Sequence, residues 1–365
     1  MKKIDNMSSK FLWRRSLKSK QMGHLSFYSA LLLTGLGLSI SAQIPVVAQA
    51  PAEFVIPIYE PTAPPPPSVE PDFNLRQENL RITSLLENID GDLWVGSWQG
   101  LSRINPNTGE ILKRIDLTNY NVEALAMDKV GRIWVGTTQG LLRVDARSNE
   151  VTQQNILLPS NRVVSLLVDQ RGYLWVGTDQ GLVLISPDEG LVMTTLQKLP
   201  GLRPNAMTLD QGGNLWLGTL LGLVQINTAS AYPMQTVRNI TGGVVNSLTT
   251  APDGQLWAGT LNGLLVIEPT TGEILRDVTA MRKKNVTSVR FGQDGTVWAG
   301  TDEGITRLKA DSGLVLGRVG QLPSRQVLAI APDVGNKLWV GTQQGLAWVS
   351  LTTGLARPHY GFVQP

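Results

Sequence analysis

The 365-residue chain contains no cysteine and only two histidines, His24 and His359. The absence of cysteine excludes disulfide bonds, a lipid-modified N-terminal cysteine and thiolate ligands for a metal. Because histidine is also scarce, the side chains that most often act as general base or bind transition metals are nearly missing. We therefore expect neither a metal nor another cofactor, and any catalytic chemistry would have to rely on carboxylates.

Tryptophan, by contrast, recurs at a regular interval. Seven copies of a motif of the type LWVGTDQG place tryptophans 40 or 41 residues apart, at Trp94, Trp134, Trp175, Trp216, Trp257, Trp298 and Trp339. A period of this length indicates a solenoid, a propeller or another repeat array. Around each tryptophan, short apolar segments rich in Val, Leu and Ile are separated by Gly, Asp and Asn, which is the pattern of short strands.

Each repeat has room for four short strands, which together make one blade of a β-propeller. In the third repeat the pattern predicts strands over residues 162–169, 174–178, 182–186 and 191–196, with Gly172 in a turn that requires a positive φ. Gly177 is expected where neighbouring backbones approach closely. The sequence thus predicts an all-β fold, a seven-bladed β-propeller with four-stranded antiparallel blades and a tryptophan packed between neighbouring sheets. The expected blade starts are Ile82, Val122, Val163, Pro204, Val245, Val286 and Val327.

Two segments compete to supply the outer strand of the last blade. Residues 354–362 align with the fourth strand of the other repeats, because Thr353-Gly354 matches Thr271-Gly272. Residues 73–77 are the alternative, in which the two ends of the ring would pair and remove an open edge. The alignment favours the C-terminal segment.

The chain before the ring divides into two parts. Residues 1–50 hold seven basic residues against Asp5, then an apolar run over 27–42 and the triplet Ala48-Gln49-Ala50, which predicts a signal peptide cleaved after Ala50. The alternative is a retained anchor helix, for which the run is shorter than the about 20 residues of a membrane span. Residues 51–72 contain eight prolines and are predicted to form a disordered spacer, the alternative being a docking motif for a domain that binds proline-rich segments.

The remaining residues, 73–365, are assigned to the propeller, which we expect in the periplasm or secreted, without a membrane span once the signal is removed. The isoelectric point of about 9.1 belongs to the whole chain. Of its 32 basic and 29 acidic residues, seven basic and one acidic lie in residues 1–50, so that the rest carries a formal charge of −3. No basic face is expected there, and nucleic acid is not among the predicted partners.

The repeats resemble those of the two-component regulator propeller family. The family pattern, an innermost strand of the type V-x-S-L-x-x-D, a D-x-x-G turn, then L-W-V-G-T and x-x-G-L, is carried by residues 163–169, 169–172, 174–178 and 180–182. The resemblance extends over residues 82 to about 355 and implies a propeller of the kind found in periplasmic sensory regions of membrane-bound histidine kinases. This sequence shows neither a kinase core nor a DNA-binding domain, so we do not expect it to signal by itself.

Positions that vary between repeats are better candidates for a site than positions that repeat, because structure demands the same residue in every blade. Thirteen residues before each tryptophan, at the predicted upper mouth of the channel, stand Arg81, Asn121, Arg162, Arg203, Val244, Asn285 and Gln326. Two positions further on stand Thr83, Glu123, Val164, Asn205, Asn246, Thr287 and Leu328. Three arginines converging on an enclosed mouth suit a carboxylate or another anion. The alternative is a hydrated channel entrance whose arginines are solvated.

A candidate partner surface lies in the turns after the tryptophan strands, on the same face. These turns are mostly polar, but they carry Trp98 in the first repeat and Leu220, Leu221 and Leu261 in the fourth and fifth. Adjacent apolar residues at a rim indicate a contact site. The alternative is that the loop 199–204 folds over the leucines and buries them.

These features predict an exported, non-catalytic binding module that recognises a protein partner, an anionic small molecule or a glycan, with a sensory role among the expected uses. Repeated carboxylates such as Asp128, Asp169 and Asp210 are assigned to hairpin turns. The alternative function is a lyase or hydrolase acting on a polyanionic glycan, with Glu123 as base. That alternative requires a second ionisable group within hydrogen-bonding reach of the transferred proton.

Overall fold

The computed structural model describes residues 80–117, 120–155 and 158–362. The expected signal peptide (1–50), the proline-rich spacer (51–72) and the segment 73–77 lie outside these described residues, so the expectations for them remain predictions. Within the described part, no helix is both long enough and apolar enough to cross a membrane.

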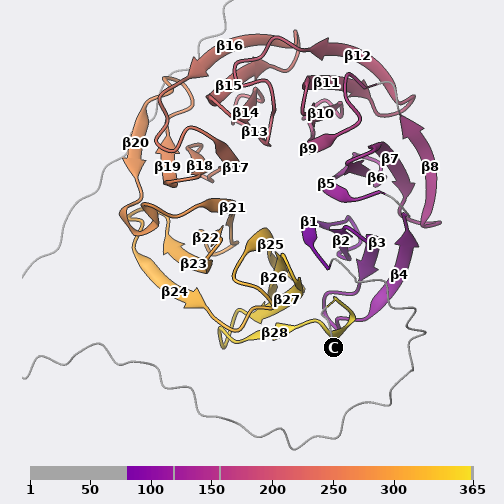
Figure 1. The fold of residues 1–365 in the computed structure, drawn as a ribbon, viewed down its shortest axis with the longest axis vertical. Helices are drawn as coiled ribbons and strands as arrows, with labels where there is room; N and C mark the ends of the chain where they lie inside the picture. Colours follow the sequence, from indigo (N-terminus) through magenta and orange to yellow (C-terminus); the bar gives the residue numbers. More distant parts are fainter. Residues whose placement is uncertain (1–79, 118–119, 156–157, 363–365) are drawn as a thin grey trace, which may run out of the picture. The chain divides into compact units, whose positions relative to one another are not determined.

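Seven four-stranded antiparallel sheets form a ring around a central opening, as the sequence predicts (Figure 1). In every sheet the strand order follows the chain from the innermost strand to the rim. Blades 1 and 2 comprise β1 (Ile82–Glu87), β2 (Leu93–Ser97), β3 (Gly100–Ile104), β4 (Ile111–Asp116), β5 (Val122–Met127), β6 (Ile133–Thr137), β7 (Gly140–Asp145) and β8 (Glu150–Asn155). Blades 3 and 4 comprise β9 (Val163–Val168), β10 (Leu174–Thr178), β11 (Gly181–Ser186), β12 (Leu191–Leu196), β13 (Ala206–Leu209), β14 (Leu215–Thr219), β15 (Gly222–Asn227) and β16 (Tyr232–Val237).

The remaining three blades follow the same plan. Blades 5 and 6 comprise β17 (Val245–Thr250), β18 (Leu256–Thr260), β19 (Gly263–Ile267), β20 (Ile274–Asp277), β21 (Val286–Phe291), β22 (Thr296–Thr301), β23 (Gly304–Lys309) and β24 (Val315–Val319). Blade 7 comprises β25 (Val327–Val334), β26 (Lys337–Thr342), β27 (Gly345–Ser350) and β28 (Ala356–Pro358). Two short 3-10 helices, η1 (Thr279–Met281) and η2 (Tyr360–Phe362), complete the described elements.

Blade 4 departs from the expected start. The sequence pattern predicts its innermost strand from Pro204, but β13 begins at Ala206. Proline has no backbone N–H to donate to the ladder, so that the pairing is taken up by Asn205, whose N–H donates to the Gly218 carbonyl (2.8 Å). The other six blades begin at the predicted residues.

The seven tryptophans are buried between neighbouring sheets, and the most exposed of them, Trp298, is 5% accessible. Each one packs against the strands of the next blade; Trp94 of blade 1, for example, lies in one cluster with Val122, Ile133 and Val135 of blade 2. Trp339 of blade 7 packs in the same way against blade 1. Every blade thus supplies part of the core of its neighbour, which explains why a single blade would leave apolar surface uncovered.

Glycine after the tryptophan strand is required by this close packing. A Cβ added at Gly177 would lie 2.8 Å from the carbonyl oxygen of Pro204 in the next blade, closer than real Cβ contacts. Cβ atoms added at Gly96 and Gly341 would likewise meet the next blade, at 2.6 and 2.7 Å from the side chains of Val122 and Ile82. The expectation that neighbouring backbones approach closely here is confirmed.

The C-terminal segment closes the ring, as the alignment favours: β28 is the fourth strand of blade 7 and pairs with β27. After β28, the His359 Nε2–H donates to the Gly109 carbonyl of blade 1 (2.7 Å), and the Nδ1 of the same ring accepts from the Gly361 N–H (3.2 Å). Phe362 is buried in the cluster that joins blades 7 and 1. Figure 1 shows this end of the chain beside β4.

Candidate functional site

We call the face that carries the turns after the tryptophan strands the upper face, and the face that carries the first hairpin turns the lower face. On the lower face, Asp128, Asp169 and Asp210 cap their turns, as predicted, since each Oδ1 accepts a backbone N–H four residues on. The same residues have a second contact that the sequence pattern did not reveal. Their Oδ2 atoms accept the indole N–H of the buried tryptophan six residues later, at 3.1 or 3.2 Å. These carboxylates therefore stabilise the fold.

The predicted upper mouth is a real grouping of residues. The carbonyls of Arg81, Asn121, Arg162 and Gln326 accept the N–H of the turns after the tryptophan strands, at 3.0 to 3.3 Å. These bonds show that two sets of residues lie on the same face. One set precedes the innermost strands, and the other forms the turns after the tryptophan strands. The structure thus brings together the two sets of residues that the sequence singled out.

Three arginines of the mouth surround one carboxylate. Burial raises the pKa of Glu123 above its usual value, and the positive charges of Arg81, Arg162 and Arg203 oppose that shift. Burial also lowers the pKa of Arg203, and the charge of Arg162 lowers it further. Arg81 lies over the ring of Trp98, with its guanidinium carbon 4.9 Å from the ring centroid. Among the described residues, none of the three arginines and no Glu123 oxygen takes part in an ion pair within 4.0 Å.

Unsatisfied polar atoms are concentrated at this mouth. Nine buried side-chain N or O atoms of the described residues have no hydrogen-bond partner, and five of them belong here: Arg81 Nε, Trp98 Nε1, Gln99 Nε2, Asp179 Oδ1 and Arg203 Nε. Buried polar groups are normally hydrogen-bonded, so a cluster of unpaired ones indicates a place prepared for water or a ligand.

The second predicted ring, two positions further into the channel, is largely structural. Thr83 Oγ1 donates to the carbonyl of Val122 in the next blade (2.5 Å), and Thr287 Oγ1 does the same to Val327 (2.6 Å). Asn205 Nδ2 donates to the Val245 carbonyl (3.3 Å). The Nδ2 of Asn246 donates to the Oδ1 of Asn285 (3.0 Å), which joins two candidate site residues. These side chains link neighbouring blades, whereas Glu123 has no such bond.

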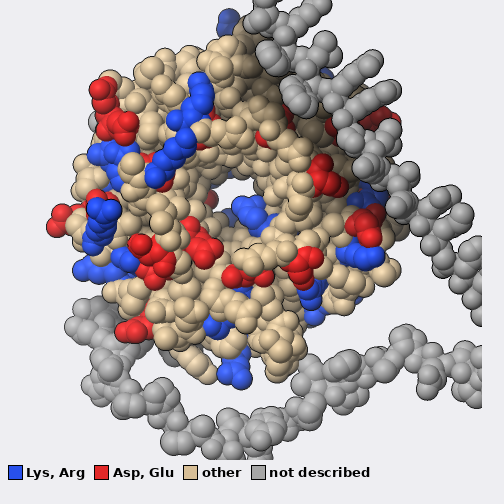
Figure 2. Space-filling model, turned by 180° about the vertical axis from the view of Figure 1, so that it is seen from behind, with Lys and Arg blue, Asp and Glu red and all other residues tan. Residues whose placement is uncertain are grey.

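The channel holds a cavity of about 180 Å³ that is lined by the innermost segments of all seven blades. Two of its lining residues are ionisable, Glu123 and Arg290. Sequence reasoning missed Arg290, although the other repeats have Leu, Ala or Thr at that position. The Arg290 side chain lies in the channel, where water reaches it but protein surrounds it on all sides. The resulting desolvation lowers the pKa of Arg290. Figure 2 shows basic atoms within the central opening.

The basic loop 282–284, between blades 5 and 6, adds less positive charge to the mouth than its sequence indicates. Arg282 forms an ion pair with Asp277 (2.9 Å), and Lys284 pairs with Glu303. Their charges are compensated outside the channel.

The candidate partner surface is exposed in part. Leu220, Leu221 and Leu261 are 43%, 63% and 49% accessible, so the loop 199–204 does not bury them. That loop adds a fourth apolar residue, Leu202, which is 41% accessible. Trp98, by contrast, is half-buried beneath Arg81 and does not belong to the exposed set.

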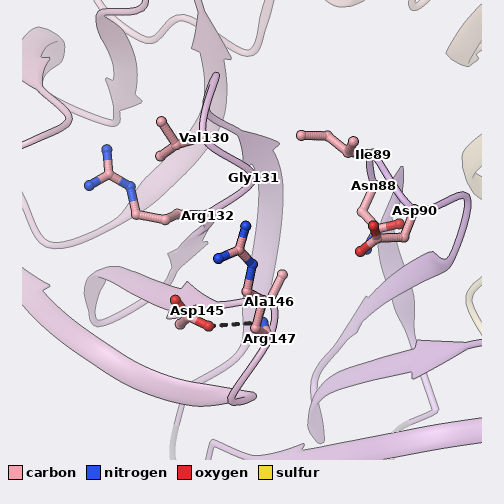
Figure 3. A pocket seen from close by; sticks show the side chains of 9 residues that line it. All are labelled: Asn88, Ile89, Asp90, Val130, Gly131, Arg132, Asp145, Ala146 and Arg147. Atoms are coloured by element: carbon pink, nitrogen blue, oxygen red, sulfur yellow. Dashed lines mark hydrogen bonds between the residues drawn. The ribbon is translucent and has the colours of Figure 1, made fainter.

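A groove of about 350 Å³ lies between the lower turns of blades 1 and 2. Figure 3 shows Asn88 and Asp90 on one wall and Arg132 and Arg147 on the other. The Arg132 guanidinium is already bound to Asp128 (2.6 Å) and Asp188 (3.0 Å). Because Arg132, one of the two arginines that line this groove, already binds two carboxylates, the groove is a weaker candidate than the mouth.

Glu123 is the carboxylate on which the alternative enzymatic function depends. In the described part of the chain no ionisable side chain lies within hydrogen-bonding distance of its carboxylate. His359 lies in the seam between blades 7 and 1, bonded to backbone groups. No group of three or more His, Asp and Glu side chains in residues 80–117, 120–155 and 158–362 could hold a metal ion.

The comparisons with known proteins agree with this architecture. The family model described as "Two component regulator propeller" matches residues 116–139 and 157–180, and the same motif recurs in the other blades. The chain thus carries two-component regulator propeller repeats. No curated protein is similar enough to count as a match.

Two similar solved structures come from B. thetaiotaomicron. The extracellular domain of a putative one component system matches with a TM-score of 0.65 and 20% identity, over 73% of this chain and 38% of that chain. The extracellular domain of a putative hybrid two component system gives 0.62 and 20%, over 74% and 40%. This chain therefore spans about two fifths of the length of these structures. At such identities the likeness shows the fold.

A third similar structure is an enzyme. A catalytically inactive histidine-to-alanine variant of virginiamycin B lyase from Staphylococcus aureus, with quinupristin, gives a TM-score of 0.63 and 18% identity, over 74% of this chain and 94% of that chain. The seven-bladed ring is thus shared by regulator domains and by a lyase, and the fold alone does not decide between binding and catalysis.

Proposed function

We propose that this protein is an exported binding module that recognises an anionic ligand at the upper mouth of the channel, in a sensory role like that of regulator propellers. The main support for this proposal is the cluster of polar atoms without a hydrogen-bond partner at the mouth, among them the Nε atoms of Arg81 and Arg203. An anion would supply the acceptors that these buried donors lack, and guanidinium groups match carboxylates in shape.

Several features support this proposal. Arg162 and Arg203 stand at matching positions of adjacent blades, and each influences the charge state of Glu123. Arg290 adds a cation deeper in the same channel. Leu202, Leu220, Leu221 and Leu261 lie on the same face and would contact an apolar part of the ligand or a protein partner. The two regulator-type neighbours are extracellular domains, which favours a periplasmic or secreted location.

We propose binding rather than catalysis because Glu123 has no acid–base partner among the described residues. A lyase or hydrolase would need a second group to donate or accept a proton near Glu123. His359 does not serve that purpose, because it is held in the seam between blades 7 and 1.

The test is a double substitution, Arg162→Ala with Arg203→Ala. Oligogalacturonates, citrate and succinate serve as anionic probes, and the matching neutral sugars and amides as controls, in calorimetric titrations of the whole chain. We expect the double variant to unfold at the wild-type temperature and to lose binding of anions by about a hundredfold, because two charge-assisted contacts are removed.

A charge-matched control distinguishes a local site from general electrostatics. Lys113→Ala with Arg318→Ala removes two exposed cations from the outer strands β4 and β24. This control should bind anions as the wild type does. If no anion binds the wild type, or if the control loses as much affinity as the double variant, the mouth is a hydrated channel entrance and the proposal fails.

A further inference from the structure

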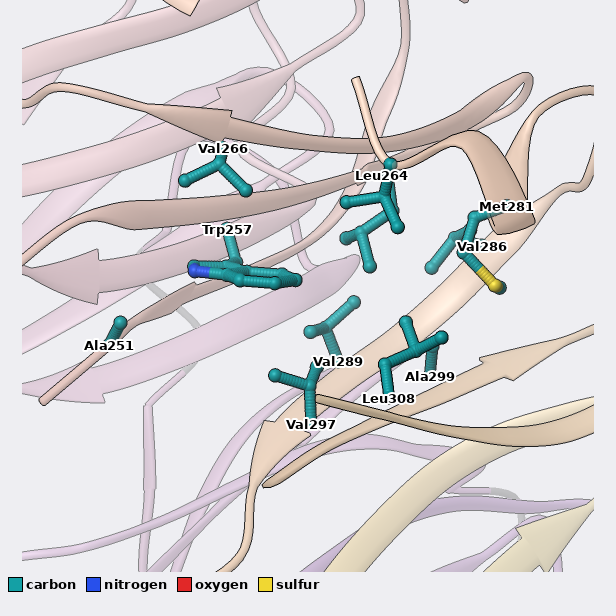
Figure 4. Packing of buried hydrophobic residues seen from close by; sticks show 11 residues of the cluster. Ala251, Trp257, Leu264, Val266, Met281, Val286, Val289, Val297, Ala299 and Leu308 are labelled. Carbon is teal, nitrogen blue, oxygen red and sulfur yellow. The ribbon is translucent and has the colours of Figure 1, made fainter. Parts of the chain in front are cut away.

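Blade 5 lacks the carboxylate that accepts the indole N–H in blades 2 to 4. Ala251 stands six residues before Trp257, where blades 2 to 4 have Asp128, Asp169 and Asp210. The Trp257 N–H donates to no acceptor among the described residues. Figure 4 shows the indole nitrogen turned to the side of Ala251 and away from the packed cluster around Leu308.

The missing side chain leaves a pocket. A cavity of about 500 Å³ between the lower parts of blades 5 and 6 is lined by Ala251, Trp257, Phe291 and Leu275, among others. Phe291 meets Trp257 edge-on, with ring centroids 5.6 Å apart. Leu275 stands at the rim and is 46% accessible. The volume is that of a typical small-ligand site, about 300–1,000 Å³, and the walls are mainly apolar.

A cation also lines this pocket. The Arg276 guanidinium carbon lies 5.3 Å from the centroid of the Trp257 ring, and Nη2 donates to the Ala310 carbonyl (2.6 Å). In the described part of the chain no carboxylate pairs with Arg276. The two acidic groups of the lining have partners, since Asp253 accepts the Gln255 N–H (3.1 Å) and Asp311 pairs with Lys309 (2.8 Å).

The other blades show what usually occupies this place. In blade 2, Asp128 Oδ2 accepts both the Trp134 indole N–H (3.2 Å) and Arg132 Nε (2.6 Å). In blade 3, Asp169 Oδ2 accepts the Trp175 N–H (3.1 Å) and an Arg171 nitrogen (2.7 Å). Blade 5 has the indole and an arginine without the carboxylate between them.

The turns of the other three blades differ from this arrangement. In blade 7, Asp333 stands at this position, and the Trp339 N–H donates to the Val334 carbonyl (3.1 Å). In blade 1 the Trp94 N–H is also unpaired, but it is buried. In blade 6 the position is Gly292, and oxygens of Asp294 and Asp333 lie 2.9 and 3.4 Å from the place of its missing Cβ. Blade 5 alone among the described blades combines an unpaired indole, an apolar cavity and an uncompensated cation.

We propose that this pocket binds a small monocarboxylate with a ring-sized apolar body. The ligand carboxylate takes the place of the missing aspartate, accepts the Trp257 N–H and lies close to Arg276, while the body contacts Phe291 and Leu275. This site is separate from the upper mouth and does not depend on the function proposed for it.

The test observes Trp257 directly. In ¹⁵N spectra of the whole chain, Trp257→Phe identifies the indole N–H signal, and benzoate is the probe. We expect a saturable shift of that signal with benzoate, an affinity at least about tenfold lower for acetate, which lacks the apolar body, and about tenfold lower for the neutral benzyl alcohol. Arg162→Ala with Arg203→Ala should leave the benzoate response unchanged.

Ala251→Asp restores the residue of blades 2 to 4 and should abolish the benzoate response, with the Trp257 signal already shifted in the absence of ligand. The matched control is Ala229→Asp on an exposed lower turn of blade 4, which should respond as the wild type does. Leu275→Glu, a change at the exposed rim, should weaken benzoate at least about tenfold even if Ala251→Asp folds poorly. The proposal is overturned if the Trp257 signal of the wild type does not shift at about 50 mM benzoate. It is also overturned if folded Ala251→Asp responds to benzoate as the wild type does.

Discussion

The two ends of the innermost strand of blade 3 differ in how completely their polar groups are satisfied. At the lower end, Asp169 accepts two backbone N–H groups, the Trp175 indole and an Arg171 nitrogen. At the upper end, Arg162 is exposed, and the side chains of Arg162, Arg203 and Glu123 make no ion pair within 4.0 Å among the described residues. Groups that hold the fold together use their hydrogen-bonding capacity on one another, whereas groups with spare capacity are available to a ligand.

The comparison implies that substitutions at the repeated positions lower the free energy of unfolding, whereas substitutions at the variable positions weaken ligand binding. The largest loss is expected for Gly177→Val, because a branched side chain would meet the Pro204 carbonyl at the seam between blades 3 and 4. We expect at least about 3 kcal/mol of destabilisation in urea unfolding. Gly317→Val on the outer strand β24 is the control, since a Cβ there has no neighbour within 4 Å, and it should stay within about 0.5 kcal/mol. Equal effects of the two substitutions would contradict the close approach.

Asp169→Ala compared with Arg162→Ala tests the two ends of one strand directly. Loss of Asp169 leaves the Trp175 indole N–H buried without an acceptor and removes the turn cap, which should cost about 2–3 kcal/mol. Arg162→Ala removes an exposed side chain and should change stability by less than about 0.5 kcal/mol. Similar losses for both variants in urea unfolding would show that the upper end is as structural as the lower end.

The third prediction concerns the pH dependence of the seam between blades 7 and 1. Burial lowers the pKa of His359 below its usual value of 6.5, and the nearby charge of Arg114 acts in the same direction. The neutral ring is favoured in the folded state, because Nδ1 must accept the Gly361 N–H while Nε2–H donates to the Gly109 carbonyl. The unfolded chain therefore binds the extra proton first as the pH falls.

A group with a lowered histidine pKa contributes its full stability above the unfolded pKa, near 6.5, and loses it as the pH falls from there toward the folded pKa. We expect the melting temperature to fall more steeply between pH 7 and 5 for the wild type than for His359→Gln, which cannot titrate. Parallel pH profiles for the two proteins would rule out His359 as the titrating group of the seam.

The repeated part of the molecule could be predicted from sequence because periodicity shows it directly. Trp175 and Gly177 recur at fixed spacing in all seven repeats, and the strands of blade 3 are predicted within one residue at each end. The predicted start of blade 4 is wrong because Pro204 has no backbone N–H to pair in the sheet, and this outweighs the repeat pattern.

The site was predicted less completely, for two physical reasons. Contacts between blades are invisible in a single repeat, so the sequence does not show that the Nδ2 atoms of Asn205 and Asn246, both predicted to bind a ligand, donate to neighbouring blades. A residue that departs from the repeat in one blade only is also overlooked when a sequence is read for known motifs. Arg290 and Ala251 break the repeat at their positions, and comparing the repeats column by column would have found both.

The smallest effect on stability is expected at the exposed leucines, which lie on the upper face but differ from the arginines in chemistry. Leu220→Asp with Leu261→Asp changes two side chains that are 43% and 49% accessible, so unfolding should shift by less than about 0.5 kcal/mol. Binding to a protein partner, or to the apolar part of a ligand, should nevertheless weaken, because adjacent exposed apolar residues act as contact sites. Leu314→Asp with Leu316→Asp, in and beside the outer strand β24 and 63% and 47% accessible, is the matched control that should bind normally. Unfolding and capture measured on the same samples separate the outcomes: a large loss of stability would place the leucines in the core, and equal binding by all three proteins would remove the upper-face leucines from the proposed contact surface.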